Sequence, residues 1–580
     1  MRFPLLLTTS VFAFALIGLT ACGDDDPVSP TVEPPLGLQV TATGSASIRV
    51  TFNGRAANDS YTIERAEGVT GTFAAVTTVS APATDGAVTY DDTGLNVLTT
   101  YRYRVKATRG SASSTYGSEQ STTTLALGAF TRTVTGDIAT NITWYRDTTY
   151  TLNGFIHVAN GATLTIEAGT TIKGDFNTVG SSLFILRGAK IIAIGTAALP
   201  IVLTSSQPVG QRKPGDWGGL IIVGNGVINR TGVEIEIEGT NTATGTAPGT
   251  NYKVTYSGGT TNTDNSGELR YVRVEYAGYA PSINNELNSF SFAAVGSGTK
   301  LSFLQAMAGL DDSFEFWGGA VDATNLVSYE AGDDHFDMSE GFQGRLQYLI
   351  GLQTTRLTPR TLAGSPSSDP QGIENDGCEG AGCTNGKNTT PYTYPVVANF
   401  TLIGTNDMAT SGSSGGIGMM LRRGTGGFYV NGLLARWPRA AISVRDAETF
   451  ARASNSATPD LTTTDLAVRN VLIAESALAF QAGTGQNAFD LTGNGIVQDN
   501  AAIATTLLTA FPATIGSTTT AAALDWTPAA SSAAATGGLT TFAGRLSTAA
   551  GTAITPTSYR GAVAPGGTKW WLGWTVYNQQ

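Results

Sequence analysis

The chain has 580 residues, a formal net charge of −11 and a sequence pI near 4.8. An acidic surface repels phosphate backbones, so these values argue against nucleic acid as a partner. Only 14% of the residues are charged and 71 are glycine. Together with frequent Thr, Ser, Ala and Val, this composition is typical of β-structure with many turns.

The first 21 residues have the pattern of a secretory signal peptide. A single cation, Arg2, precedes an apolar stretch that is too short for a comfortable membrane span, and small residues follow. The ending Leu19-Thr20-Ala21-Cys22 resembles the bacterial lipobox, in which the cysteine is acylated. This resemblance implies a lipid anchor on Cys22, with the membrane as a partner.

Residues 22–35 are predicted to join the lipidated cysteine to a flexible tether. Asp24-Asp25-Asp26 stand close behind Cys22, and the proline-bearing residues 27–35 should be extended and solvated. The acidic cluster is similar to the surface-export signals of some lipoproteins of diderm bacteria. It implies a cell-envelope location, with the outer membrane and its outer face as the expected destination.

Residues 36–126 contain six or seven short alternating runs separated by turn residues, which predicts a β-sandwich. The run Asp92-Thr93-Gly94-Leu95 and residues 99–107 resemble a fibronectin type III domain. The resemblance assigns Leu95 and Tyr101 to a tyrosine corner and places Phe52 where the family usually has a core tryptophan. We expect a spacer or docking module without catalysis.

Residues 127–580 are a long succession of glycine-bounded β-runs. The run Asp311-Asp312-Ser313-Phe314-Glu315 returns 22 residues later as Asp333-Asp334-His335-Phe336-Asp337. A period near 22 predicts the coils of a parallel β-helix, because each coil buries its apolar face only by stacking on its neighbours.

Several phrases in this region resemble right-handed β-helix lipoproteins of diderm bacteria. They include Gly215-Asp216-Trp217-Gly218-Gly219, Gly372-Ile373-Glu374-Asn375-Asp376 and Trp571-Leu572-Gly573-Trp574. The resemblance covers most of residues 140–580 and implies an all-β chain, with a fibronectin type III sandwich before a long right-handed parallel β-helix of the pectin-lyase-like kind. That fold hosts many polysaccharide lyases and hydrolases, but a fold alone supplies no activity.

The acidic repeat is the strongest candidate site. If 22 residues make one coil, the acids stack about 4.8 Å apart as the pairs Asp311 and Asp333, Asp312 and Asp334, and Glu315 and Asp337. Stacked like charges raise one another's pKa or recruit a cation, and carboxylate oxygens suit Ca²⁺. One interpretation is therefore a structural Ca²⁺ site or a hydrogen-bonded ladder of acidic turns.

Two alternatives for this repeat stay open. It could form a carbohydrate-binding face, with the rings of Phe314, Phe316, Trp317 and Phe336 as stacking platforms. Alternation, however, favours a core position for Phe314 and Phe336 and an outward one for the acids. It could instead be catalytic, with paired carboxylates as general acid and base. A lyase would combine Ca²⁺ with a basic residue, for which Arg345 is the nearest candidate.

The remaining cysteines and the histidines limit other chemistry. Cys378 and Cys383 have four residues between them, two of them glycine, and outside the cytoplasm they are predicted to form a disulfide. The chain has only two histidines, His157 and His335, and neither has a partner at metal-ligand spacing. This argues against a zinc site or a Ser-His-Asp triad.

These features favour a cell-envelope lipoprotein that presents its β-helix to polysaccharides or envelope proteins without catalysis, with Ca²⁺ as a structural ion. One alternative is a polysaccharide lyase or glycoside hydrolase acting within residues 311–337. The other is a purely structural envelope protein.

Overall fold

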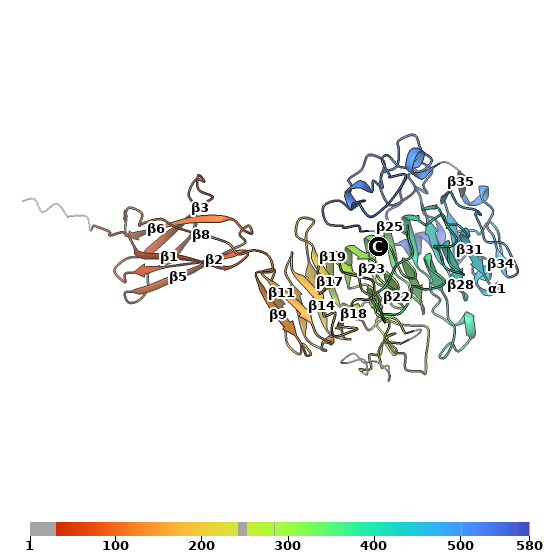
Figure 1. Cartoon of the computed structure of the whole chain (residues 1–580), viewed down its shortest axis with the longest axis horizontal. Helices are drawn as coiled ribbons and strands as arrows, with labels where there is room; N and C mark the ends of the chain where they lie inside the picture. Colours follow the sequence, from red (N-terminus) through yellow and green to blue (C-terminus); the bar gives the residue numbers. More distant parts are fainter. Residues whose placement is uncertain (1–30, 242–251, 283–284, 500–501, 579–580) are drawn as a thin grey trace, which may run out of the picture. The chain divides into compact units, whose positions relative to one another are not determined.

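The structure is a computed structural model that describes residues 31–241, 252–282, 285–499 and 502–578 (Figure 1). The chain forms two compact units that divide between Leu125 and Ala126. Both units are built from strands, as the sequence predicts. Cys22, the predicted site of lipidation, lies outside the described residues.

The first unit is an antiparallel β-sandwich. One sheet has the order β1-β2-β5, and the other has the order β4-β3-β6, with β7 and β8 both paired to β6. The strands are β1 (Leu36–Gly44), β2 (Ser47–Gly54), β3 (Ser60–Glu67), β4 (Ala74–Ser80), β5 (Gly86–Thr93), β6 (Thr100–Arg109), β7 (Ala112–Ser113) and β8 (Gln120–Thr123).

The core of this sandwich follows from alternation along its strands. Along β6, for example, Tyr101, Tyr103 and Val105 are buried and their neighbours are not. The Tyr101 hydroxyl accepts a hydrogen bond from the backbone N–H of Asn96 at 3.0 Å, which is the geometry expected of a tyrosine corner. Phe52 is fully buried, so it fills the predicted core position.

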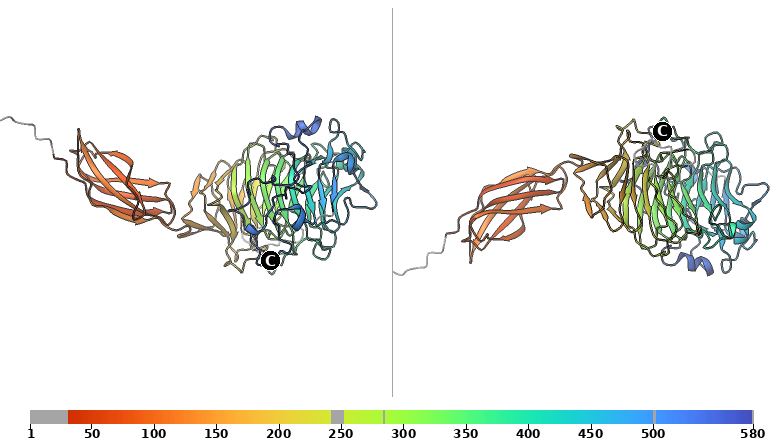
Figure 2. Two further views of the ribbon diagram at one scale, coloured as in Figure 1. Left: turned by 90° about the horizontal axis from the view of Figure 1, so that it is seen from above. Right: turned by 90° about the horizontal axis from the view of Figure 1, so that it is seen from below.

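The second unit is a parallel β-helix, whose strands stack as rungs in both views of Figure 2. One wall is a ten-stranded sheet whose neighbours are parallel except for the last pair. In order its strands are β12 (Phe155–Val158), β15 (Ser182–Ile185), β18 (Gly219–Val223), β20 (Phe290–Ala293), β22 (Phe314–Trp317), β24 (Phe336–Ser339), β26 (Gln371–Asp376), β28 (Ile417–Arg422), β31 (Ala440–Arg445) and β34 (Gln486–Asn487).

The rest of the coil wall is a seventeen-stranded sheet. Its strands are β9 (Phe130–Val134), β10 (Ile142–Trp144), β11 (Thr148–Leu152), β13 (Thr163–Ile166), β14 (Thr171–Gly174), β16 (Lys190–Ile194), β17 (Ile201–Ser205), β19 (Gly267–Glu275), β21 (Lys300–Met307), β23 (Asp322–Tyr329), β25 (Arg345–Leu352), β27 (Val396–Ile403), β29 (Gly427–Val430), β30 (Leu433–Ala435), β32 (Leu466–Arg469), β33 (Leu472–Ala474) and β35 (Val497–Asp499).

The long strands of this second sheet bend in the middle. Tyr271 in β19, Phe303 in β21 and Asn325 in β23 all have φ between 51° and 60°. This left-handed conformation is uncommon for residues other than glycine, and it turns each strand onto a new side of the coil. The bends stack on successive coils, and the rings of Tyr271 and Phe303 lie 4.5 Å apart.

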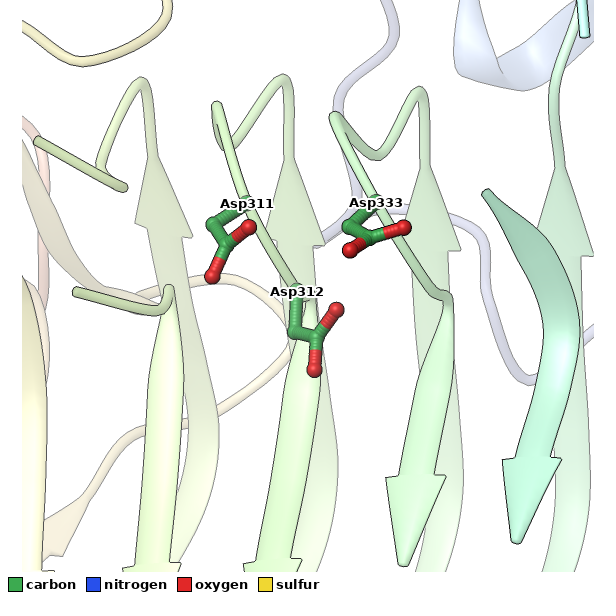
Figure 3. A group of neighbouring side chains, drawn as sticks. All are labelled: Asp311, Asp312 and Asp333. Carbon is green, nitrogen blue, oxygen red and sulfur yellow. The ribbon is translucent and has the colours of Figure 1, made fainter. Parts of the chain in front are cut away.

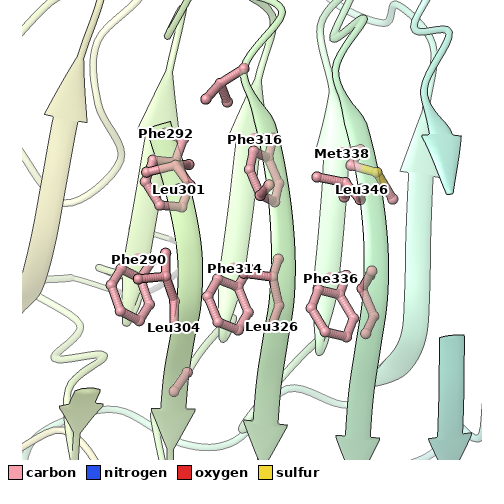
Figure 4. Packing of buried hydrophobic residues seen from close by; sticks show 14 of the residues in the cluster. Phe290, Phe292, Leu301, Leu304, Phe314, Phe316, Leu326, Phe336, Met338 and Leu346 are labelled. Carbon is pink, nitrogen blue, oxygen red and sulfur yellow. The ribbon is translucent and has the colours of Figure 1, made fainter. Parts of the chain in front are cut away.

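The predicted 22-residue coil is confirmed. Phe314 on β22 pairs in register with Phe336 on β24, and Glu315 pairs with Asp337. Inside the helix, the rings of Phe290, Phe314 and Phe336 stack at centroid distances of 5.0 and 5.4 Å (Figure 4). Side chains along a strand point alternately inward and outward, so each core phenylalanine places the side chain that follows it on the outer face.

The chain after β35 differs from the prediction of further coils up to residue 580. Within residues 502–578 it adds no strand to either sheet. It instead packs on the outside of the seventeen-stranded sheet, where Trp526, Trp571 and Trp574 join an apolar cluster with Tyr329 and Met307. The glycine- and alanine-rich composition of this segment resembles that of the coils, but its apolar residues lack their alternation.

Only short helices interrupt the described strands. They are α1 (Ala447–Arg452), α2 (Gly544–Ala550), the 3-10 helices η1 (Gly386–Asn388), η2 (Thr492–Asn494) and η4 (Ala521–Ala523), and the π-helical η3 (Ile503–Leu507).

Insertions between strands cover the outer face of the ten-stranded sheet. The insertion between β18 and β19 packs Ile235, Ile237 and Tyr256 against Trp317 and Phe184 of the sheet. A second insertion, residues 353–370, and a third, residues 377–395, come before and after β26. Side chains that alternation turns outward are therefore not all exposed to solvent.

Candidate functional site

Three acids lie in one row on the outer face of the ten-stranded sheet. Glu315 on β22, Asp337 on β24 and Glu374 on β26 are in register on consecutive strands. Their neighbours Phe314 and Phe336 point into the core, so the three carboxylates point outward. We call Glu315, Asp337 and Glu374 the acid row.

Four more acids stand in the turns that precede β22 and β24. Asp311 and Asp333 take equivalent places on successive turns, and Asp312 follows Asp311 (Figure 3). The Asp312 carboxylate accepts a hydrogen bond from the backbone N–H of Asp334 at 2.8 Å. We call Asp311, Asp312, Asp333 and Asp334 the acid turns, and their predicted stacking is confirmed.

The acid turns and the acid row form three overlapping groups in which the carboxylate oxygens lie within 4.8 Å of one another. The groups are Asp311, Asp312 and Asp333; Asp312, Glu315 and Asp337; and Asp334, Asp337 and Glu374. Oxygen ligands at such separations can hold a divalent cation.

Burial changes the protonation of these acids. Asp312, Glu315 and Asp334 are between 4% and 6% exposed, so these acids are buried although alternation turns the acid row away from the core. Burial raises the pKa of each well above its usual range, and the neighbouring carboxylates raise it further. A cation within the groups would relieve both effects.

Two oxygens of the site lack a partner in the described chain. Asp333 Oδ1 and Asp337 Oδ1 are shielded from solvent and accept no hydrogen bond there. A buried acceptor without a donor is costly, and such groups usually contact an ion, a water molecule or a ligand. The residues present therefore fit a bound cation.

The basic residue beside the acids is not the one predicted. Arg345 donates to Asp322 at 2.7 Å on the seventeen-stranded sheet. Arg422, on β28 of the ten-stranded sheet, instead pairs with Glu374 and with Asp376, the latter at 2.8 Å. The coil length separating Arg422 from Asp376 is 46 residues, so the 22-residue repeat gives no signal for this contact.

An open pocket adjoins the acid turns, with a cavity volume of about 690 Å³. Insertions from three parts of the chain form its wall. Its lining residues are Glu238, Tyr279, Ala280, Pro281, Ser282, Glu286, Asp311, Asp333, Leu362, Gly364, Ser365, Pro366, Ser367 and Ser368. We call this the acid pocket, and its size is typical of ligand sites.

Two acids of the pocket have pKa values close to neutral pH. Burial raises the pKa of Glu238 to about 8, and the nearby Glu286 contributes to this rise. Burial likewise raises the pKa of Asp333 to about 7. Such groups can exchange protons near neutrality, as general acids and bases do.

The aromatic residues of the repeat do not form a binding face. Phe314, Phe316 and Phe336 are fully buried, and Trp317 is 7% exposed and stacks on Tyr256 beneath an insertion. The core position predicted for Phe314 and Phe336 is confirmed. Their use as stacking platforms for a glycan is excluded.

Cys378 and Cys383 form the predicted disulfide. It closes the turn directly after β26, and Glu379 within that turn pairs with Arg423. The disulfide thus holds a loop next to the end of the acid row. The Nδ1 atom of the buried His335 is hydrogen-bonded to the hydroxyl of Ser328.

Comparison with known proteins supports this description. The family described as a pectate-lyase-like β-helix domain matches residues 136–528, which include the acid row and the acid turns. This chain belongs to that family. No curated protein sequence matches the chain.

Similar solved structures fall into two kinds. The FN5 domain of Drosophila Lar is 20% identical over 17% of this chain and 99% of its own, and an FN3 domain of human collagen XX is 22% identical over 17% of this chain and 98% of its own, both with a TM-score of 0.14. A family 28 exopolygalacturonase of Yersinia enterocolitica is 12% identical over 79% of this β-helix chain and 85% of its own, with a TM-score of 0.16. Because these TM-scores are low, the fold is assigned from the strand orders described above and not from these similarities.

No helix in the described residues is both long enough and apolar enough to cross a membrane.

Proposed function

We propose that this β-helix protein is a cell-envelope lipoprotein that binds glycans in its acid pocket with a divalent cation held beside it. Cys22 would carry the anchor, and the β-sandwich would act as a spacer. The observation that carries the proposal is the placement of buried, overlapping carboxylate groups next to an open pocket of ligand size.

The cation is best accommodated by Asp312, Glu315 and Asp337. These three acids form one group, and Asp337 contributes an oxygen without a hydrogen-bond donor. Glu374 is a weaker ligand because Arg422 already pairs with it. Ca²⁺ prefers such oxygen ligands and would supply the positive charge that the buried acids lack.

The cation would order the site without taking part in a reaction. Asp312 accepts a hydrogen bond from Asp334 N–H, and Asp334 in turn accepts one from the backbone N–H of Gln371 at 2.5 Å. A charge held at Asp312 therefore fixes the two turns that carry Asp311 and Asp333 into the acid pocket. Glycan affinity should depend on the cation for this reason.

The test is glycan retention by the full-length protein on a panel of immobilised polysaccharides, with Ca²⁺ or with chelator. We expect retention with Ca²⁺ and at least a tenfold loss with chelator. Asp312→Asn should reproduce the loss, whereas Glu268→Gln, on the solvent face of β19, should not. Absence of retention on every polysaccharide would refute the proposal.

Hydrolysis of the bound glycan is a second candidate function. It is favoured by the pKa of Glu238 near 8 and of Asp333 near 7, because one carboxyl can then carry a proton at neutral pH. Elimination is less favoured, since no lysine or arginine lines the described pocket. New reducing ends that depend on Asp333, measured on the same panel, would establish hydrolysis.

A further inference from the structure

The C-terminal segment lies on coils whose backbone pairing is complete without it. The strands β21, β23, β25 and β27 each pair with a neighbouring strand on both edges. Residues 539–577 contribute no strand to this sheet, and we call them the strap. The strap can therefore attach to these coils, or detach from them, without breaking a strand pair.

Buried side-chain amides hold the strap by its backbone. Gln305 on β21 donates to the carbonyl of Val576 at 2.5 Å and accepts from the N–H of the same residue at 2.9 Å. Gln347 on β25 pairs with Thr555 in the same way, at 2.7 and 3.0 Å. The two glutamines are at most 2% exposed. A half-docked strap would leave such amides buried without partners, so we expect the strap to dock and detach as a unit.

The end of the strap contacts a buried carboxylate that also holds a loop. Glu330 follows β23 and is fully buried. It accepts a hydrogen bond from the Tyr577 hydroxyl at 2.7 Å. It also accepts two from Thr354, one from the backbone N–H at 3.0 Å and one from the hydroxyl at 2.5 Å. Thr354 stands at the start of the insertion of residues 353–370, so Glu330 joins the strap to this insertion.

This insertion forms part of the wall of the acid pocket. Leu362, Ser365 and Ser367 line the pocket from it. Residues 353–370 form no strand or helix, so their path depends on contacts such as those with Glu330. Glu330 also stands three residues before Asp333, which lines the same pocket. Both the insertion and the turn that carries Asp333 therefore start at the contact that Tyr577 completes.

We infer that the strap regulates the acid pocket: Tyr577, docked on Glu330, holds the insertion of residues 353–370 where it forms the pocket wall, and detachment of the strap frees that wall. For its effect on glycan binding the inference rests on the proposed function, because it concerns the same pocket. The coupling between the strap and the insertion is a property of the protein alone, so it can be measured without a glycan.

The first test is hydrogen–deuterium exchange of the full-length protein and of Tyr577→Phe, which removes only the hydroxyl that contacts Glu330. We expect the backbone amides of residues 356–370 to exchange at least tenfold faster in the variant, and those of β21 and β23 to be unchanged. Tyr559→Phe is the matched control, because Tyr559 also lies in the strap but is hydrogen-bonded to Tyr348. Unchanged exchange in Tyr577→Phe, or equally fast exchange in Tyr559→Phe, would overturn the inference.

The second test repeats the retention experiment with the same panel of immobilised polysaccharides and with Ca²⁺ present. The unaltered protein and Tyr559→Phe should be retained equally, and Tyr577→Phe should bind at least fivefold more weakly. Equal retention of all three proteins would overturn regulation by the strap and leave the proposed function standing. No retention of the unaltered protein would refute the proposed function, and hydrogen exchange would still decide whether the strap holds the insertion.

Discussion

At the scale of single residues, alternation along a strand sets the direction in which an acidic side chain points, and loops from distant parts of the chain determine how deeply that side chain is buried. Glu315 and Asp337 point outward because Phe314 and Phe336 point inward. They are nevertheless enclosed, since insertions from elsewhere in the chain lie over the sheet. Enclosed like charges are unfavourable without a counter-ion, so these residues should respond strongly to cation removal.

Asp337→Asn should separate two effects of the acid row on stability: the cost of burying its carboxyl groups and the gain from binding a cation. In chelator the variant should melt at or above the temperature of the unaltered protein, because it removes a carboxyl group whose pKa is raised by burial and by the neighbouring carboxylates, and whose charged form is therefore unfavourable in the folded protein. With Ca²⁺ at about 100 times its Kd, the unaltered protein should gain about 2.7 kcal/mol, and the variant should gain much less. Tryptophan fluorescence is a suitable signal, since all eight tryptophans lie in the β-helix unit. Equal stabilisation by Ca²⁺ in both proteins would contradict a role of Asp337 as a ligand.

Arg422→Met should be more harmful than Arg345→Met. Arg422 is paired with Glu374 and Asp376, which are 7% exposed. Removing it leaves the buried Glu374 carboxylate without its basic partner, whereas Asp376 keeps its pair with Arg423. Loss of a partner from a buried pair costs about 3–5 kcal/mol. The side chains of Arg345 and Asp322 are 26% and 29% exposed, so their pair should contribute about 1 kcal/mol or less. Urea unfolding followed by tryptophan fluorescence would measure both, and similar losses would show that the Arg422 network is not important to stability.

At the scale of elements, the stacked core rings hold the coils that carry the site. Phe314 lies between Phe290 and Phe336 with interplanar angles of 3° and 7°. It is fully buried, and the coil above and the coil below both lose a contact if the ring is removed. Register at Glu315 therefore depends on Phe314.

Phe314→Ala should cost about 3–5 kcal/mol, the usual range for a buried aromatic residue. Phe303→Ala is the matched control, because Phe303 is half-buried at a bend on the outside of the helix. We expect a smaller loss for Phe303→Ala in the same urea experiment. A larger loss at Phe303 would mean that the outer bends, and not the inner stack, hold the coils together.

The C-terminal segment is an element of a different kind, since it covers the coils and does not extend them. Trp526 donates a hydrogen bond to the Tyr329 hydroxyl at 3.0 Å, and Tyr577 donates to Glu330 at 2.7 Å. A chain that ends at residue 499 should expose this apolar face of the seventeen-stranded sheet. We expect increased binding of a hydrophobic dye and loss of solubility, and unchanged dye binding would indicate that the segment is dispensable.

At the scale of the whole molecule, the sequence predicts the repeating parts well and the inserted parts poorly. The 22-residue recurrence predicts that Glu315 pairs in register with Asp337, because residues one repeat apart take equivalent places on successive coils. Arg422 reaches the acid row across a longer coil, and Glu238 reaches the pocket from an insertion, so no local spacing marks either of them. Burial of the acids could not be predicted for the same reason, because it depends on loops whose path has no period.

The two units should also behave as separate folding units. The β-sandwich has its own core around Phe52, Tyr61 and Tyr103. A fragment of residues 31–125 should therefore fold alone and melt at the same temperature as the first unit does in the full chain, as calorimetry can test. Failure of this fragment to fold would show that the β-sandwich depends on the β-helix unit.

Titration of Ca²⁺ into the metal-free, full-length protein tests the central claim most directly. The account predicts saturable binding at neutral pH that weakens at least tenfold in Glu315→Gln and is unchanged in Glu268→Gln. No binding to the folded protein, or equal affinity in Glu315→Gln, would contradict the claim that the buried acids hold a cation.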